Sequence, residues 1–515
     1  MSQPALPPDV FAKVTQAWAI QDYAEGERLL AAACRTHPDH WHLRTCHAAA
    51  LGYCSRFSEA KAAFDSLIDD APPEKKIHMH GLLGVEWCRI GRHDLAIPLL
   101  RVAVAAPSPV APIYEALASA QEHLGQYAEA RETLSEGLRQ HPEHPGMMLV
   151  LARVQHHARE FDLAEQTAYA VWTHPKASPE ALSMAGHELS AALDAQKRFA
   201  EAFTALKEAK TVRQAQLAPF KPIWERGQQH LNNLTLLPTR ADFMRWAAAP
   251  RPQPECRLAF LVGCPRSGTT LLERVMDAHP DLVSASETTV FNNVWNSQLH
   301  RMRLNTTLLG TLDGLGPADI GRLRDAYWTQ MAGALDMPAG GRLLLDKNPS
   351  QLTQMPAACR LFPESKILMA VRDPRAIAWS CYSQHLPDNA ESAGFNTLRT
   401  TAAHVAGQLR FWLHLRRELP ANQWHETRYE NMVGDFEAES KRTLAFLGLP
   451  WDAGVAQFHA NPSPVRSPTY AQASQPVYAH AVDKWRNYSA FIGDAFDELD
   501  GVAKELGYST RHRAS

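Results

Sequence analysis

A two-residue motif recurs at nearly constant spacing through the N-terminal half of the chain, and this spacing restricts the fold more than any other feature. Each copy is an aromatic residue or histidine followed three positions later by glycine or alanine. The copies are Tyr23/Gly26, Phe57/Ala60, His93/Ala96, Tyr127/Ala130, Phe161/Ala164 and Phe199/Ala202. Successive copies are 34, 36, 34, 34 and 38 residues apart. A period of this length indicates stacked supersecondary units.

A proline follows each of the first five copies after 14 or 15 residues. These prolines are Pro38, Pro72, Pro107, Pro142 and Pro175. The intervening stretches have apolar residues at helical spacing, and proline ends a helix. The pattern resembles the tetratricopeptide repeat, a helix–turn–helix unit. Residues 1–235 are therefore expected to form an all-α superhelix of about six repeats. Such arrays offer a concave surface for a peptide or partner protein; the alternative is that the array only scaffolds or dimerises the second half.

Length and composition set outer limits on the function. A chain of 515 residues is expected to hold two or three domains. A net charge of −3 gives no reason to expect a nucleic-acid partner. No signal peptide is visible at the N-terminus, and the most apolar run, Leu258 to Val262, is far shorter than the roughly 20 residues of a membrane span. The eight cysteines include no CxxC pair. A cytoplasmic protein without a metal site is expected.

The proline-rich segment Pro250–Pro254 suggests a linker over residues 236–255, followed by a second domain over 256–515. Leu258 to Val262 is suited to a buried parallel strand, and a helix is expected from Thr269 onward. Between them, Gly263 to Gly268 forms a tight loop. A strand, a glycine-bearing loop and a helix N-terminus together make an anion-binding cradle.

The loop departs from the nucleotide-hydrolysing P-loop at one position. The spacing from Gly263 to Gly268 matches GxxxxGK[ST], but Thr269 replaces the lysine that reaches the β- and γ-phosphates. A nucleotide with one phosphate and one sulfate at its 5′ position has no γ-phosphate to hold. The departure therefore favours a phosphosulfate over ATP or GTP.

A second anion site is expected farther along the chain. Lys366 to Val371 is another candidate buried strand, and it runs into Arg372 and then a helix that contains Ser380. Ligands of α/β sheets bind at the carboxyl ends of the strands. Two anion sites on one sheet suit a nucleotide that is phosphorylated at both ends. The alternative role for Arg372 is an ion pair with Asp373 or a helix cap.

These segments resemble the 5′-phosphosulfate and 3′-phosphate motifs of sulfotransferases that use 3′-phosphoadenosine 5′-phosphosulfate (PAPS). The likeness is to the tyrosylprotein sulfotransferase branch and to its bacterial relatives with N-terminal tetratricopeptide repeats. The resemblance covers about residues 256–490 and implies a three-layer α/β domain with a mostly parallel sheet. It rests on Pro265–Leu272, Asp277–Pro280, Ser286–Thr289, Asp346–Pro349, Arg372–Ser380, Gln475–Tyr478 and Lys484–Trp485.

The resemblance also implies residue roles. Glu287 would be the general base, and Lys347 would stabilise the bridging oxygen of the departing nucleotide, with Arg266 as a further catalytic residue. His279 is a rival base, but it closes a helix, where a histidine more often caps carbonyls. No metal is implied. The expected nucleotide-binding residues are Arg266, Ser267, Gly268, Thr269 and Thr270 for the 5′-phosphosulfate, Arg372 and Ser380 for the 3′-phosphate, and Ser467 and Lys484 as a cover.

One departure from the family bears on the acceptor. Animal tyrosylprotein enzymes carry an arginine two residues after the catalytic glutamate, where it helps receive acidic peptides, and this chain has Thr289 there. The hydroxyl acceptor is therefore left open among protein or peptide tyrosine, a glycan, a lipid and a small molecule. The alternative functions are a P-loop kinase or NTPase, and a non-enzymatic adaptor whose second domain is inert.

Overall fold

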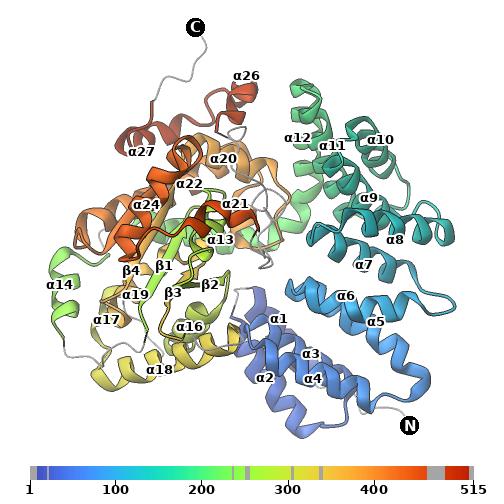
Figure 1. The fold of residues 1–515 in the computed structure, drawn as a ribbon, viewed down its shortest axis with the longest axis horizontal. Helices are drawn as coiled ribbons and strands as arrows, with labels where there is room; N and C mark the ends of the chain where they lie inside the picture. Colours follow the sequence, from blue (N-terminus) through green and yellow to red (C-terminus); the bar gives the residue numbers. More distant parts are fainter. Residues whose placement is uncertain are drawn as a thin grey trace.

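A computed structural model describes residues 8–19, 22–234, 237–249, 256–302, 307–335, 340–460 and 482–509. Ser467 and Gln475–Tyr478 lie outside the described residues. An all-helical solenoid occupies one side of the molecule, and an α/β domain occupies the other (Figure 1). This architecture confirms the predicted fold class.

The solenoid is built from twelve helices in antiparallel pairs. Every residue that opens a copy of the repeated motif is also the first residue of an even-numbered helix, so the 34-residue period is the period of the helix pairs. The helices are α1 (Pro8–Ala19), α2 (Tyr23–Thr36), α3 (Trp41–Tyr53), α4 (Phe57–Asp70), α5 (Pro73–Ile90), α6 (His93–Val104), α7 (Ala111–His123), α8 (Tyr127–Gln140), α9 (Pro145–His157), α10 (Phe161–Trp172), α11 (Pro179–Ala195) and α12 (Phe199–Leu217).

Small residues let these helices approach closely. The glycine or alanine of each motif is buried; Ala60, Ala96 and Ala130, for example, are fully inaccessible. Gly186 in α11 shows the constraint directly, because a Cβ there would lie 2.6 Å from the Cβ of Ala209 in α12. Each helix buries its apolar face against its neighbours, as a stacked array requires.

The second domain contains a five-stranded parallel sheet in the order β2-β3-β1-β4-β5. Its strands are β1 (Leu258–Gly263), β2 (Leu282–Ser286), β3 (Leu343–Lys347), β4 (Lys366–Val371) and β5 (Trp424–Arg428). All six residues of β1 are buried. Ala259 and Leu261 face one apolar core, and Leu258, Phe260 and Val262 face another, so both sides of the sheet are covered.

Helices form the two outer layers. On one side, α15 and α24 share a core with the sheet, and on the other side α16, α18, α19, α20 and α22 share a larger core. The helices are η1 (Ala218–Phe220), α13 (Lys221–Asn232), α14 (Arg240–Ala248), α15 (Thr269–Asp277), α16 (Val290–Met302), α17 (Leu308–Asp313), α18 (Pro317–Ala334), η3 (Pro349–Gln354), α19 (Met355–Leu361), α20 (Pro374–Ser383), α21 (Ala390–Gly394), α22 (Leu398–Glu418), α23 (Tyr429–Gly434), α24 (Phe436–Leu447), η4 (Ala453–Ala460), η6 (Lys484–Tyr488), α26 (Ser489–Ile492), η7 (Asp497–Leu499) and α27 (Asp500–Glu505).

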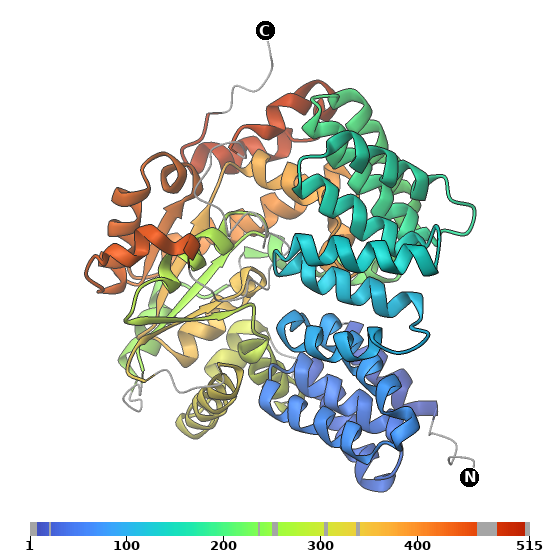
Figure 2. The ribbon, with the colours of Figure 1, turned by 45° about the vertical axis from the view of Figure 1, so that its right-hand side comes forward.

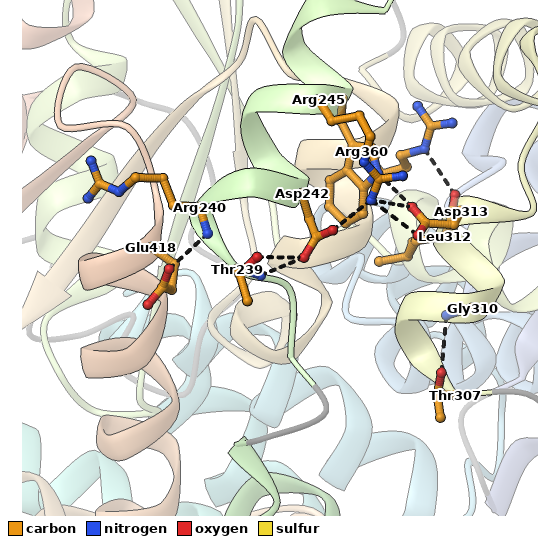
Figure 3. A network of polar contacts seen from close by, with 11 residues as sticks. Thr239, Arg240, Asp242, Arg245, Thr307, Gly310, Leu312, Asp313, Arg360 and Glu418 are labelled. Carbon is orange, nitrogen blue, oxygen red and sulfur yellow. Dashed lines mark hydrogen bonds and ion pairs between the residues drawn. The ribbon is translucent and has the colours of Figure 1, made fainter.

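Helix α14, which lies in the predicted linker, docks on the second domain through polar contacts (Figure 3). The backbone N–H of Arg240 donates to Glu418 of α22 at 2.8 Å. The guanidinium of Arg245 binds both Asp242 and Asp313 of α17, at 2.6 and 3.0 Å. These contacts fix the path of the chain between the two halves. The domain boundaries stay a prediction.

Both ends of the solenoid contact the α/β domain, and the helices between them follow an arc around it (Figure 2). At the first repeats, α2 contacts α16 and α4 contacts α18. At the last repeat, α12 contacts η6 and α21. The repeats are therefore integrated with the second domain at two separate places.

Two further observations concern the described part of the chain. None of its helices combines the length and the apolar character that crossing a membrane requires. The eight cysteines are all described, and all are free thiols.

Candidate active site

Four predicted residues lie at the same edge of the sheet. β1 ends at Gly263 and β3 ends at Lys347, while Glu287 directly follows β2 and Arg372 directly follows β4. Because the strands are parallel, their carboxyl ends meet at one edge, which is where α/β proteins place ligands. Residues far apart in the sequence are thereby gathered around the end of β1.

The loop after β1 has the backbone of an anion cradle. Arg266 and Gly268 adopt positive φ angles of 69° and 99°. A Cβ at Gly268 would lie 2.7 Å from Cδ2 of Tyr429, so this position accepts only glycine without displacement. Thr269 and Thr270 open α15 and are buried, with the N–H groups of the first helical turn beside them. The Ser267 hydroxyl is buried and has no hydrogen-bond partner among the described residues.

The two predicted anion-binding segments are in direct contact. Nε of Arg266 donates to Oγ of Ser380 at 3.1 Å, and Nη1 of Arg372 donates to the backbone carbonyl of Arg266 at 3.0 Å. The Arg372 guanidinium also lies 4.6 Å from the centre of the Tyr429 ring. Asp373, the alternative partner for Arg372, accepts a hydrogen bond from Nε of Arg375 at 2.9 Å.

Lys347 is the most deeply buried charge of the site. Its side chain is fully inaccessible, and its ammonium contacts Oε1 of Glu287 directly. The same ammonium lies 3.4 Å from Oε2 of Glu273 and donates to Oγ1 of Thr270 at 3.4 Å. Glu273 in turn accepts hydrogen bonds from the hydroxyls of Ser284 and Ser286, at 2.7 and 3.2 Å.

Burial and neighbouring charges shift the pKa values of Lys347 and Glu273 in opposite directions. Burial alone would lower the pKa of Lys347, but the carboxylates of Glu287 and Glu273 outweigh it, and the pKa is raised. Burial raises the pKa of Glu273, although Lys347 and the two serine hydroxyls oppose this. The ammonium form of Lys347 is therefore held at neutral pH by its two carboxylate neighbours.

The backbone around Glu287 is fixed in an uncommon conformation. Glu287 has a φ of 47°, in the left-handed region, and its N–H donates to the carbonyl of Lys347 at 2.7 Å. The side-chain amide of Asn348 donates to the carbonyl of Thr288 at 3.0 Å. Thr289 donates to the carbonyl of Tyr53, the last residue of solenoid helix α3, at 2.9 Å. The Glu287 side chain remains 29% exposed, so solvent reaches it.

Two other predicted residues lie away from this cluster. His279 follows α15 close to the start of β2, at the opposite edge of the sheet, where its Nε2 lies 3.0 Å from the carbonyl of Pro450. Lys484 forms an ion pair with Asp194 of α11 at 2.6 Å. Its segment nevertheless packs near Ser380, because Tyr488 stacks on Trp379 at 3.9 Å between ring centres.

Sequence reasoning missed two residues of the site. Glu273 lies four residues after Thr269, so both face the sheet from the same side of α15; this helical spacing is the signal that could have found it. Tyr429 comes directly after β5, at the same carboxyl edge, and it supports both Gly268 and Arg372. Its position after a strand was the corresponding signal.

The chain was compared with known proteins. Residues 259–453 match the sulfotransferase family, and residues 115–181 match the tetratricopeptide repeat. Protein-tyrosine sulfotransferase 2 of Gallus gallus is 28% identical over 278 residues, which cover 50% of this chain and 71% of that protein. An uncharacterized protein of Aquifex aeolicus is 24% identical over 259 residues, which cover 50% of this chain and 34% of that protein.

Among solved structures, the sulfotransferase domain of the Synechococcus PCC 7002 olefin synthase aligns with 51% of this chain and 99% of its own, at 21% identity and a TM-score of 0.38. The family matches bear out the resemblance that the motifs indicated. The chain therefore carries one stretch similar to the tetratricopeptide repeat and another similar to the sulfotransferase family.

Proposed function

We propose that this protein transfers a sulfuryl group from PAPS to a hydroxyl of an acceptor. One observation carries the proposal: the partly exposed carboxylate of Glu287 contacts the buried ammonium of Lys347 beside the cradle of Arg266 to Thr270. A proton acceptor next to a fixed cation and an anion cradle matches the needs of sulfuryl transfer to a hydroxyl.

The residues present fit the donor. Gly268 lets the loop pass close to the Tyr429 ring, which a Cβ would meet at 2.7 Å, and the Ser267 hydroxyl is buried without a partner among the described residues, as expected of a group that receives an anionic ligand. Arg266 to Thr270 would hold the 5′-phosphosulfate, and Arg372 and Ser380 would hold the 3′-phosphate. The Arg266–Ser380 hydrogen bond places these two sets next to each other.

In the proposed reaction, PAPS supplies an electrophilic sulfur that is bonded to a phosphate oxygen. Glu287 takes the proton of the acceptor hydroxyl as that oxygen forms its new bond to sulfur. The bond between sulfur and the bridging oxygen breaks, and its electron pair stays on the 5′-phosphate. Lys347 stabilises the charge on that oxygen, a task suited to a compact ammonium. No covalent bond to the protein is formed.

The acceptor and the partners also belong to this proposal. The relative from Gallus gallus is named a protein-tyrosine sulfotransferase, so a protein or peptide tyrosine is one candidate acceptor. Thr289, however, uses its hydroxyl to bind the solenoid. Glycan, lipid and small-molecule hydroxyls therefore remain candidates. The concave side of the repeats is the proposed site for a protein or peptide partner, and a cytoplasmic location remains part of the proposal.

A nucleotide titration tests the proposal against a P-loop kinase or NTPase. Thermal stability is measured with 3′-phosphoadenosine 5′-phosphate (PAP) in the absence of magnesium, and with ATP in its presence. PAP should raise the unfolding temperature, and above Kd the stabilisation should grow with the logarithm of its concentration. Stabilisation by Mg-ATP, with none by PAP, would refute the proposal.

Glu287→Ala separates chemistry from binding. The variant should keep PAP affinity within about threefold and lose at least a hundredfold in transfer from labelled PAPS to components of a cell extract. Transfer at the wild-type rate would show that another group is the base.

A further inference from the structure

Glu273 is a buried carboxylate that the proposed reaction does not use. It is 4% exposed and lies in the second turn of α15. The hydroxyls of Ser284 and Ser286 hold its two oxygens, and Oε2 lies 3.4 Å from Nζ of Lys347. Placing an ionisable carboxyl in such a site is costly unless it is compensated by a partner. Lys347 is that partner.

Lys347 needs this carboxylate at one stage of the reaction in particular. In the structure as it stands, Glu287 contacts the ammonium directly and offsets its burial. Once Glu287 has accepted a proton it is neutral, and Lys347 must serve the phosphate oxygen of the nucleotide instead. A buried ammonium left without a carboxylate loses its proton readily. Glu273 is the second carboxylate in reach.

The other polar groups around this pair do not replace Glu273. Thr270 offers only a neutral hydroxyl at 3.4 Å. Asp346 precedes Lys347 in β3, so its side chain points to the opposite face of the sheet, where it accepts the hydroxyl of Tyr327 at 2.9 Å. Arg274, next to Glu273 in α15, carries the same charge as Lys347, and burial lowers its pKa.

We propose that Glu273 is a positioning residue that keeps Lys347 protonated and in place after Glu287 is neutralised. The role rests on the proposed function. It predicts that Glu287 alone can be neutralised without loss of the Lys347 charge, and that neutralising both carboxylates removes it.

The test is the pH dependence of PAP affinity, measured by calorimetry on the full chain. Glutamine at position 287 imitates the protonated base. Glu287→Gln should bind PAP with nearly constant affinity between about pH 7 and pH 9. The double variant Glu287→Gln/Glu273→Gln should lose at least about tenfold in affinity over the same range, because Lys347 deprotonates. In the triple variant Glu287→Gln/Glu273→Gln/Lys347→Met this alkaline loss should disappear, because the titrating ammonium is gone.

Glu439→Gln in the Glu287→Gln background is the matched control. Glu439 is 2% exposed in α24 and accepts the N–H of Arg428, so its substitution also neutralises a buried glutamate, but away from Lys347. Its pH profile should stay flat. Should the double variant fail to fold, Glu273→Asp in the same background withdraws the carboxylate by one methylene and should give a smaller alkaline loss.

Each outcome separates the two proposals. Wild-type protein that does not bind PAP refutes the proposed function. Wild-type binding together with a flat profile in the double variant, or in the Asp variant where the double does not fold, refutes only the role of Glu273. An alkaline loss already present in Glu287→Gln also refutes it, because Glu273 would then not suffice.

Discussion

Gly268 joins the conformation of the loop to the second anion site. Its φ of 99° is uncommon for any residue with a side chain. The side of Gly268 where a Cβ would stand faces the Tyr429 ring, and that ring packs against the Arg372 guanidinium. A change at this glycine therefore reaches two groups that are proposed to hold opposite ends of one nucleotide.

Gly268→Ala is predicted to lower PAP affinity by at least tenfold. The new Cβ would lie 2.7 Å from Cδ2 of Tyr429, so the ring and the Arg372 guanidinium must move. Calorimetric titration with PAP measures the effect. Gly125→Ala is the control, since Gly125 also has a positive φ, 74°, but nothing lies within 4 Å of its Cβ position. The control should lose stability and keep its affinity; equal affinity in both variants would contradict the prediction.

Site residues that belong to a sequence motif could be predicted. Contacts between residues that only folding brings together could not. Arg266 and Ser380 came from separate motifs, and the structure shows them hydrogen-bonded. The helical spacing from Thr269 places Glu273 on the sheet side of its helix, but the sequence does not show that the ammonium of Lys347 lies 3.4 Å from it. Lys484 was expected near the nucleotide, but its ion pair with Asp194 depends on how the solenoid packs, which no local pattern encodes.

At the scale of elements, the segment that carries Glu287 is held from three directions. The carbonyl of Lys347 in β3 receives its N–H, the side chain of Asn348 binds the carbonyl of Thr288, and the hydroxyl of Thr289 binds the end of α3. Carbonyls in the last turn of a helix lack helical partners, so the Tyr53 carbonyl is suited to accept this hydroxyl. The solenoid thus helps to fix the proposed base.

Thr289→Val is predicted to loosen this segment while leaving nucleotide binding intact. The substitution keeps the shape of the side chain and removes two hydrogen bonds, the one to the Tyr53 carbonyl and the one from the Asn293 side chain, each worth about 1 kcal/mol. Amide hydrogen exchange in residues 287–293 should accelerate by about fivefold, with PAP affinity unchanged. Thr311→Val, which removes the 3.1 Å bond to the carbonyl of Thr307 within α17, should leave exchange in this segment as in the wild type. Unchanged exchange in Thr289→Val would mean that the solenoid contact does not fix the segment.

The elements themselves were largely predictable, for a physical reason. The repeated motif marks where helices pack closely, and each of its aromatic or histidine residues begins a helix. The apolar runs from Leu258, from Leu343 and from Lys366, all predicted as strands, are β1, β3 and β4, which lie inside the sheet. The order of the strands and the docking of α14 were not predicted, because both depend on contacts between distant segments.

For the whole molecule, a cluster of basic groups lies where the last repeats meet the α/β domain. The ring of His187 in α11 lies 5.1 Å from that of His385, in the loop after α20. In the same region, Lys210 of α12 donates to the carbonyl of Phe395 at 3.2 Å, and Arg213 binds Asp388 at 2.6 Å. Burial, reinforced by the charges of Arg213, Lys210 and Arg153, lowers the pKa of His385 to about 3. Burial likewise lowers the pKa of His187, well below its ordinary value.

These shifts predict that acidification weakens the contact between the two halves. Below about pH 6.5 a histidine of the unfolded chain binds a proton, whereas His385 in the folded protein stays neutral down to about pH 3. The unfolded state therefore holds more protons in this window, and the free energy of unfolding falls as the pH falls. Between pH 7 and pH 5 the loss is about 2 kcal/mol for each such histidine.

His385→Phe, which keeps a ring against His187 but cannot be protonated, should therefore lose about 2 kcal/mol less than the wild type between pH 7 and pH 5. Urea unfolding at the two pH values measures the difference. The exposed His78 of α5 provides the control, since His78→Phe should follow the wild type. An equal loss in His385→Phe and the wild type would show that the acid sensitivity arises elsewhere. A smaller loss in His385→Phe alone would place the acid sensitivity at the contact that joins the solenoid to the helix of Ser380, so that one partly buried histidine couples the repeats to the proposed nucleotide site.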